Sequence, residues 1–225
     1  MHNTDTARAR LWQLISPTLP VGAYAYSAGL EYAVEIGWVD NEAKAMDWIT
    51  GQLMNNLSTL DIPLLARLHN AWLANDSEAA VRWSCFLLAS RESSELLAED
   101  RHLGTALAQL LPELGIEEAV SWRTGNYTSF AAMFALGAAR WNISLEETVQ
   151  GYAWAWCENQ VAAAIKLIPL GQTAGQRILS QIVDCLPAAV SHGLTLGDDD
   201  IGAVSPGVAL ACAKHETQYS RLFRS

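Results

Sequence analysis

Lysine is scarce in this chain, occurring only as Lys44, Lys166 and Lys214 among 225 residues. The 24 acidic residues outnumber the 14 basic ones and give a formal net charge of −10. Such a charge repels nucleic acid and anionic membranes at long range, so we expect neither as a partner. No run of about 18 apolar residues occurs either, so the sequence predicts no membrane-spanning helix.

Motifs for metal and nucleotide chemistry are missing as well. The four cysteines are widely spaced without a C-x-x-C pair, which argues against a zinc site or disulfides and favours buried thiols in a reducing cytoplasm. The polar N-terminus lacks a signal-peptide core. The glycine-rich stretch 171–175 lacks the lysine of a phosphate-binding loop. We therefore expect a cytoplasmic protein without metal site, cofactor or nucleotide hydrolysis of its own.

Apolar residues instead follow helical spacing almost throughout, with no sustained alternation and no Asn-Gly or Asp-Gly hairpin turn. Half of the residues (51%) are hydrophobic, enough for a sizeable core without disulfides or metal. We predict a single all-α domain over residues 1–225, a bundle of roughly eight to ten helices with no significant sheet.

Capping and breaking residues give the expected helix boundaries. Helices should begin after Asp40 or Asn41, at Phe130, at a capping box of Ser144 with Glu147, at a second box of Thr173 with Gln176, and at Ser205 with Pro206. Breaks should fall at Pro63, near Asp100 or Gly104, at Pro187 (an end or a kink) and at Gly193.

The segment SPTLPVGAYAYSAGLE, residues 16–31, contains A-Y-S-A-G, one residue short of the G-x-S-x-G elbow of serine hydrolases. That elbow needs a strand before the serine and a helix after it, and the sequence predicts no sheet. We therefore interpret Ser27 as the cap of a helix over residues 27–36, ended by Gly37, rather than as a nucleophile.

Two clusters of polar residues could suggest metal binding, but their spacing does not fit a metal site. The run Asp198–Asp200 lacks the alternate spacing and later glutamate of a calcium loop, so we expect a solvated loop. His215 and Glu216 are adjacent, and successive helical side chains point about 100° apart, so they form no metal site. We expect His215 on a helix surface.

Two further features favour an interaction role. The helix expected over residues 152–168 is apolar nearly all round, yet carries Glu158, Asn159, Gln160 and Lys166, which need a polar network or an interface. Small residues on the face of Asn159 and Lys166 would let another helix approach. The C-terminal KHETQYSRLFRS has the composition of a binding peptide, and a frayed tail is the alternative.

Four blocks in order resemble the UreF family of urease accessory proteins: residues 16–39, SRESSELLAEDRHLG (90–104), ENQVAAAIKLIPLGQTAGQR (158–177) and HETQYSRLFRS (215–225). The resemblance implies a non-catalytic nickel-insertion chaperone for urease. It also implies a dimer that joins an accessory protein called UreD or UreH, the GTPase UreG and the urease apoprotein, and that gates GTP-dependent nickel delivery.

The resemblance also assigns roles to residues. It implies a partner-binding tail at 215–225 that packs near the N-terminal segment when the UreD-type protein binds. The tail residues expected at that interface are Tyr219, Arg221, Leu222, Phe223 and Arg224. Tyr24 and Ser27 are expected to support them. Lys166, Gln172 and Gln176 are expected on the face that communicates with the GTPase, and no catalytic or metal-binding residue is implied.

Overall fold

The computed structural model describes residues 2–202 and 205–225, so Met1 and residues 203–204 of the expected domain lie outside the description. Within these ranges the chain forms ten α-helices and no strand, which confirms the all-α prediction. The helices are α1 (His2–Leu14), α2 (Leu30–Glu35), α3 (Glu42–Gln52), α4 (Ile62–Leu73), α5 (Ser77–Ala89), α6 (Ser94–Glu113), α7 (Phe130–Arg140), α8 (Leu145–Leu167), α9 (Gln172–Thr195) and α10 (Pro206–His215). Short 3-10 turns cover Ala23–Ala25, Glu117–Trp122 and Asp198–Asp200, and a π-helical segment covers Leu53–Asp61.

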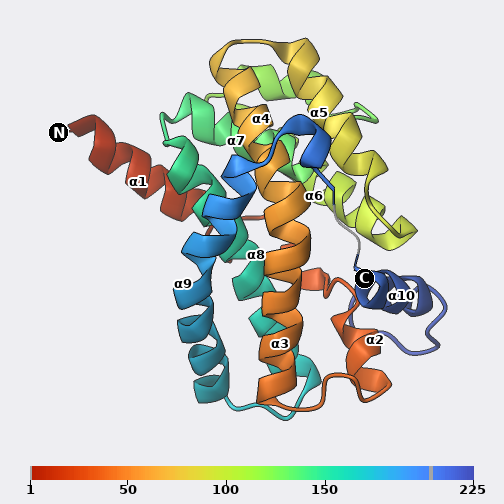
Figure 1. The fold of residues 1–225 in the computed structure, drawn as a ribbon. Coiled ribbons are helices and arrows are strands. Elements are labelled where there is room, and N and C mark those ends of the chain that lie inside the picture. Colours follow the sequence, from red (N-terminus) through yellow and green to blue (C-terminus); the bar gives the residue numbers. More distant parts are fainter. Residues whose placement is uncertain (1, 203–204) are drawn as a thin grey trace.

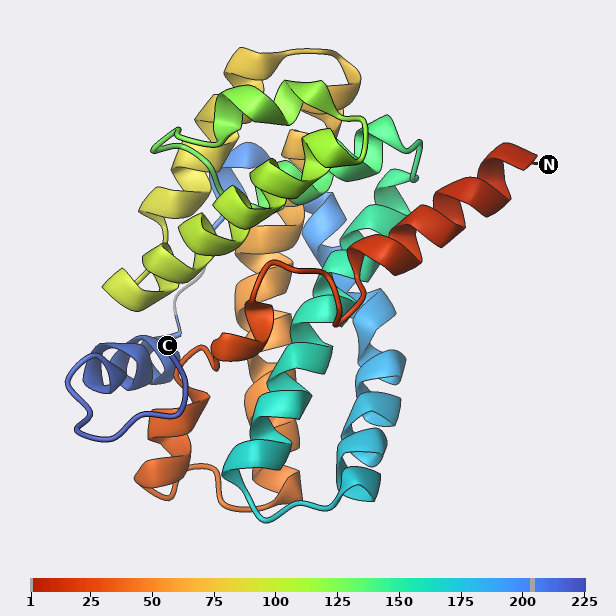
Figure 2. The ribbon, with the colours of Figure 1, turned by 180° about the vertical axis from the view of Figure 1, so that it is seen from behind.

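The helices surround one long central rod, formed by α3, the π-helical segment and α4 (Figure 1). Helices α5 and α7 pack on α4, and α6 packs on α7. Helices α8 and α9 pack together beside the lower part of the rod, where α2 and α10 also lie (Figures 1 and 2). The first turns of α1 project away from the bundle (Figure 2).

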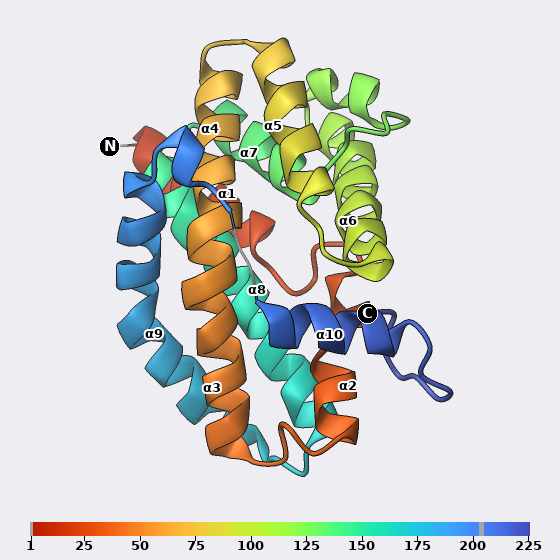
Figure 3. The same cartoon turned by 45° about the vertical axis from the view of Figure 1, so that its right-hand side comes forward.

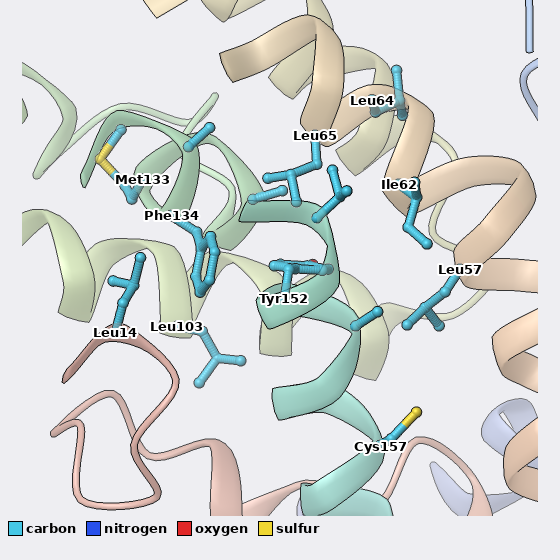
Figure 4. Close-up of a cluster of buried hydrophobic side chains, with 14 of the residues drawn as sticks. Leu14, Leu57, Ile62, Leu64, Leu65, Leu103, Met133, Phe134, Tyr152 and Cys157 are labelled. Atoms are coloured by element: carbon cyan, nitrogen blue, oxygen red, sulfur yellow. The ribbon is translucent and has the colours of Figure 1, made fainter. Parts of the chain in front are cut away.

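The core is centred on α7, whose residues 131–139 are all buried. Phe134 meets Tyr152 of α8 edge to face, with ring centroids 5.3 Å apart, while Leu65 and Leu103 lie beside them (Figure 4). Each large side chain buried in this way stabilises the fold by about 1.5–3 kcal/mol before the entropy cost. The core therefore joins α4, α6, α7 and α8.

A new α-helix does open at Pro63 as expected, since α4 begins at Ile62, but the chain stays helical across this boundary. Residues 53–61 are wound as a π-helix, and the N–H of Ile62 donates to the carbonyl of Leu57, five residues earlier. Pro63 follows at once in the first turn of α4, where a missing N–H is least costly. The wider π turn thus lets the proline enter a continuous helix.

The expected division near Asp100 or Gly104 is also wrong, since α6 is continuous through both. Gly104 serves close packing instead: a Cβ there would lie 2.6 Å from the carbonyl carbon of Ser129. The division falls earlier, between α5 and α6, where Ser93 caps α6 by accepting from the Leu96 N–H at 3.1 Å.

Helix α9 neither begins nor ends at the residues that were predicted as its boundaries. It begins at Gln172 without the Thr173 capping box, does not end at exposed Pro187, and continues past Gly193 to Thr195. A Cβ on Gly193 would lie 2.6 Å from the carbonyl oxygen of Ser58, so this glycine lets α9 cross the π-helical segment closely.

The remaining boundaries agree better with the sequence. Asn41 caps α3, Ser144 and Glu147 form the expected capping box of α8, and α7 begins at Phe130. Helix α10 begins at Pro206 as expected, but the Ser205 hydroxyl donates to Asn56 Oδ1 instead of capping it.

Candidate functional site

The C-terminal tail, residues 215–225, lies against the N-terminal segment rather than fraying. After α10 the chain turns back, and its last residues run beside residues 25–31, near α2 and α10 (Figure 3). The Arg224 N–H donates to the Ala25 carbonyl at 2.8 Å, and the Ser27 N–H donates to the Ser225 carbonyl at 3.0 Å. The two sequence blocks that are farthest apart therefore form one site.

Ser27 is fully buried at the centre of this contact. Its hydroxyl donates to the Ser225 carbonyl and accepts from the Glu31 N–H at 3.3 Å. The expected helix start at Ser27 is wrong: α2 begins at Leu30, and Gly29, at φ +80°, occupies the cap position. Ser27 does accept from the first turn, as a cap would, but its main partner is the tail. No strand occurs in the described part of the chain, so the setting of a nucleophile elbow is missing there.

Glu31 of α2 holds the backbone of the tail. Its Oε1 accepts from the Leu222 N–H at 2.6 Å, and its Oε2 accepts from the Phe223 N–H at 2.8 Å. The carboxylate is buried, where such charge-assisted hydrogen bonds are strong. Glu31 is the last residue of the segment SPTLPVGAYAYSAGLE, but nothing in its local sequence indicates this role.

Two glutamates of α6 complete a set that we call the carboxylate clasp: Glu31, Glu95 and Glu99. Glu95 accepts from Arg221 Nη1 at 2.7 Å, and Glu99 Oε2 accepts from the Ser225 hydroxyl at 2.9 Å. Burial raises the pKa of Glu99 to about 7, and the hydrogen bond from Ser225 only partly offsets this rise. The clasp thus joins α2 and α6 through the tail.

His215 lies inside the clasp, which corrects the expectation of a surface histidine. Its side chain is 0% exposed, with Nδ1 2.6 Å from Glu95 Oε2 and Nε2 3.1 Å from Glu31 Oε2. The histidine is buried because the tail and α2 fold over the end of α10. Local helical spacing cannot reveal such a contact, because Glu31 and His215 are 184 positions apart.

The predicted tail residues differ in exposure: one packs into the protein and the others face outward. Phe223 is buried, and Lys166 Nζ of α8 lies 5.6 Å from the centre of its ring, a cation–π distance. Tyr219 is fully exposed, Leu222 is 67% exposed, and Arg224 is also exposed. The face of α8 expected to meet a helix meets the N-terminal segment instead, where Asn159 Nδ2 donates to the Tyr26 carbonyl at 3.1 Å.

Three other predicted residues lie around a cavity instead of the tail. Tyr24, which is 70% exposed, lines this cavity of about 420 Å³ together with Gln172 and Gln176 from the first turn of α9. The supporting role of Tyr24 toward the tail stays a prediction. Lys166 is not among the residues that line this cavity, and its described contact is with Phe223.

A buried cluster of charged side chains also lines this cavity. Arg91 Nη2 lies 2.7 Å from both Asp61 and Asp100, and the Tyr152 hydroxyl donates to Asp61 at 3.4 Å. Burial lowers the pKa of Arg91, but the charges of Asp61 and Asp100 outweigh it and raise that pKa above its ordinary value. Glu99 lines the cavity as well, so one residue belongs to both the cavity wall and the clasp.

Metal-ligating clusters and membrane-spanning helices are both missing from residues 2–202 and 205–225. This part of the chain holds no group of three or more His, Cys, Asp or Glu side chains suited to a metal ion. None of its helices is long and apolar enough to cross a membrane.

The fold and the site define an all-α protein with a C-terminal tail docked on its own N-terminal segment. The UreF family profile matches residues 39–183. The chain is 56% identical to a urease accessory protein UreF of Alkalilimnicola ehrlichii over 99% of this chain and 98% of that protein. It is 48% identical to one of Chromohalobacter salexigens over 97% and 95%, and 47% identical to one of Hahella chejuensis over 97% and 98%. The chain belongs to the UreF family.

Proposed function

We propose that this chain is a non-catalytic urease accessory protein, a chaperone for insertion of nickel into urease. In this proposal it bridges a UreD-type accessory protein (UreD or UreH) and the GTPase UreG to the urease apoprotein and gates GTP-dependent nickel delivery. The names of its relatives support the urease context. We further propose that residues 1–225 form a single cytoplasmic domain and that the protein is a homodimer.

The observation that carries the proposal is the docked tail. Its backbone is held by Glu31 and the N-terminal segment, while Tyr219, Leu222 and Arg224 remain exposed. A segment that is already ordered loses less entropy when it binds. Tyrosine and arginine are also enriched among residues that dominate binding energy. These properties favour the tail as the surface for the UreD-type protein.

The cavity residues support a second contact surface. Gln172 and Gln176 are exposed near the start of α9, and Tyr24, also exposed, lines the same cavity. We assign Gln172 and Gln176 to the face toward UreG. Lys166 contributes to the tail surface through its contact with Phe223.

The test for the tail is capture of the UreD-type protein by point variants. Leu222→Asp should weaken capture by roughly 30-fold, because it places a charge in the centre of the proposed interface. Leu73→Asp is the matched control, since Leu73 is 54% exposed on α4, and it should capture as the wild type does. Deletion of residues 218–225 should abolish capture without loss of helical circular dichroism. Wild-type capture by both tail variants would refute this assignment.

The surfaces can be separated with Lys166→Ala and Gln176→Ala. Each variant is compared for assembly of the activation complex and for nickel content of the urease produced. We expect Gln176→Ala to lower nickel content more than assembly, and Lys166→Ala to lower assembly and nickel content together. Wild-type nickel content with Gln176→Ala would contradict the proposed GTPase face.

A further inference from the structure

His215 is the only described side chain that bridges two members of the clasp. Nδ1 faces Glu95 Oε2 at 2.6 Å, and Nε2 faces Glu31 Oε2 at 3.1 Å. Each of these two carboxylates also holds the tail directly, Glu95 through Arg221 and Glu31 through the N–H groups of Leu222 and Phe223. The histidine therefore contacts both carboxylates that position the tail.

The hydrogen-bond partners fix the number of protons on the ring. Both oxygens of Glu31 already accept backbone N–H groups, and Glu95 Oε1 accepts from Arg221. The ring nitrogens must then both donate, whereas a neutral imidazole has a single N–H. We propose that His215 is an imidazolium that positions the tail for partner binding. The partner-binding part of this inference rests on the proposed function.

The charges around the ring support the cationic form. Helix α10 packs on α2 and α6, and the groups facing His215 from these helices and the tail are Glu31, Glu95 and Arg221. With an imidazolium, two negative and two positive charges balance in this cluster. A neutral ring would leave one negative charge uncompensated in a buried place, which is costly.

Other titratable groups near the end of α10 add mainly negative charge. Glu92 and Glu99 lie on the α6 side, Cys212 is buried with its pKa raised to about 12 by burial, and exposed Lys214 and Glu216 flank His215. Burial raises the pKa of Glu99 to about 7, so Glu99 gains charge as the pH rises through neutrality. Any test must separate Glu99 from His215.

Loss of the ring proton should loosen the tail. One ring nitrogen would then turn a lone pair toward a carboxylate, and repulsion would shift Glu31 or Glu95 away from the ring. The Leu222 and Phe223 N–H groups would lose their fixed acceptor, and Leu222 would no longer be presented in one position. His215 thus acts through Glu31 and Glu95 as a positioning residue.

The first measurement uses the full wild-type chain. Correlation spectra of the histidine ring nitrogens should show both nitrogens of His215 protonated at neutral pH, assigned by their absence in His215→Gln. A His215 ring with a single N–H at neutral pH would overturn the inference.

The second measurement compares His215→Gln with His192→Gln, which alters an exposed histidine at the end of α9. His215→Gln should lower amide protection of Leu222 and Phe223 by about tenfold at neutral pH, because a charge-assisted bridge is lost. His192→Gln should not. Equal amide protection of Leu222 and Phe223 in the wild type and in His215→Gln would overturn the inference.

Capture of the UreD-type protein separates this inference from the function on which it rests. If His215→Gln loosens the tail and weakens capture, both stand. If it loosens the tail while capture is unchanged, the assignment of the tail as the partner surface fails and the charge state of His215 stands. If tail deletion abolishes capture while His215→Gln leaves protection unchanged, the positioning role fails and the proposed function stands.

Discussion

Glu31→Gln is the most direct test of the clasp, because glutamine keeps the shape of the side chain and removes its charge. Glu31 accepts from the N–H groups of Leu222 and Phe223 and faces His215 Nε2 at 3.1 Å. Glutamine has one acceptor oxygen, so it can serve only one of the two backbone donors. Its own amide N–H₂ then faces the other donor.

The magnitude follows from the loss of one hydrogen bond to a charged group. Such a bond contributes about 1.5–3 kcal/mol, and a loss of about 2 kcal/mol raises the open population of the tail by roughly 30-fold. Opening of the tail is a local event, so it should precede global unfolding. Hydrogen exchange of the Leu222 and Phe223 amides measures it directly.

The control is Glu42→Gln, which removes a carboxylate that pairs with Arg177 on the surface between α3 and α9. Tail protection in this variant should match the wild type. Unchanged protection of Leu222 and Phe223 in Glu31→Gln would refute the role of Glu31. Equal loss in both variants would show that the effect is not specific to the clasp.

Three further predictions concern the stability of the fold. Arg91→Met leaves Asp61 and Asp100 buried without a cation, and urea denaturation should show a loss of about 3–5 kcal/mol in the free energy of unfolding. Glu99 has its pKa raised by burial from 4.5 to about 7, so the native state holds the extra proton between these values. Stability should therefore fall as pH rises through this window, by up to about 1.4 kcal/mol per unit, and Glu99→Gln should flatten this fall. Gly193→Ala should lower the free energy of unfolding by about 1–3 kcal/mol, because its Cβ would lie 2.6 Å from a backbone oxygen, whereas Gly207→Ala, with nothing within 4 Å, should not destabilise the chain in thermal denaturation.

Local rules predicted the helical class and several helix starts, because periodicity and caps depend on neighbouring residues. The Ser144 capping box and the Asn41 cap formed as expected. The same rules placed a helix start at Pro63 but missed that the chain stays helical there, and they failed at Gly193, where packing decides. A π-helical turn accommodates the proline, and a close helix crossing requires the glycine.

The site was predicted in part. The resemblance directed attention to the tail and to Ser27, which the structure brings together. It did not point to Glu31, Glu95 or His215 as a cluster, because their contacts join α2, α6 and α10 across most of the chain. A charged residue in a helix has no local feature that distinguishes a buried long-range partner from an exposed surface group.

The order of synthesis gives the clasp a further consequence. Glu31 leaves the ribosome long before His215, 184 positions later, so at about 5–20 residues per second it waits roughly 10–40 s for its partner. During this interval the early segment has no tail to hold, and the surface built on Leu222 does not exist. A nascent chain that has not yet reached Leu222 therefore cannot offer that surface, because one of the two blocks that build it has not been synthesised.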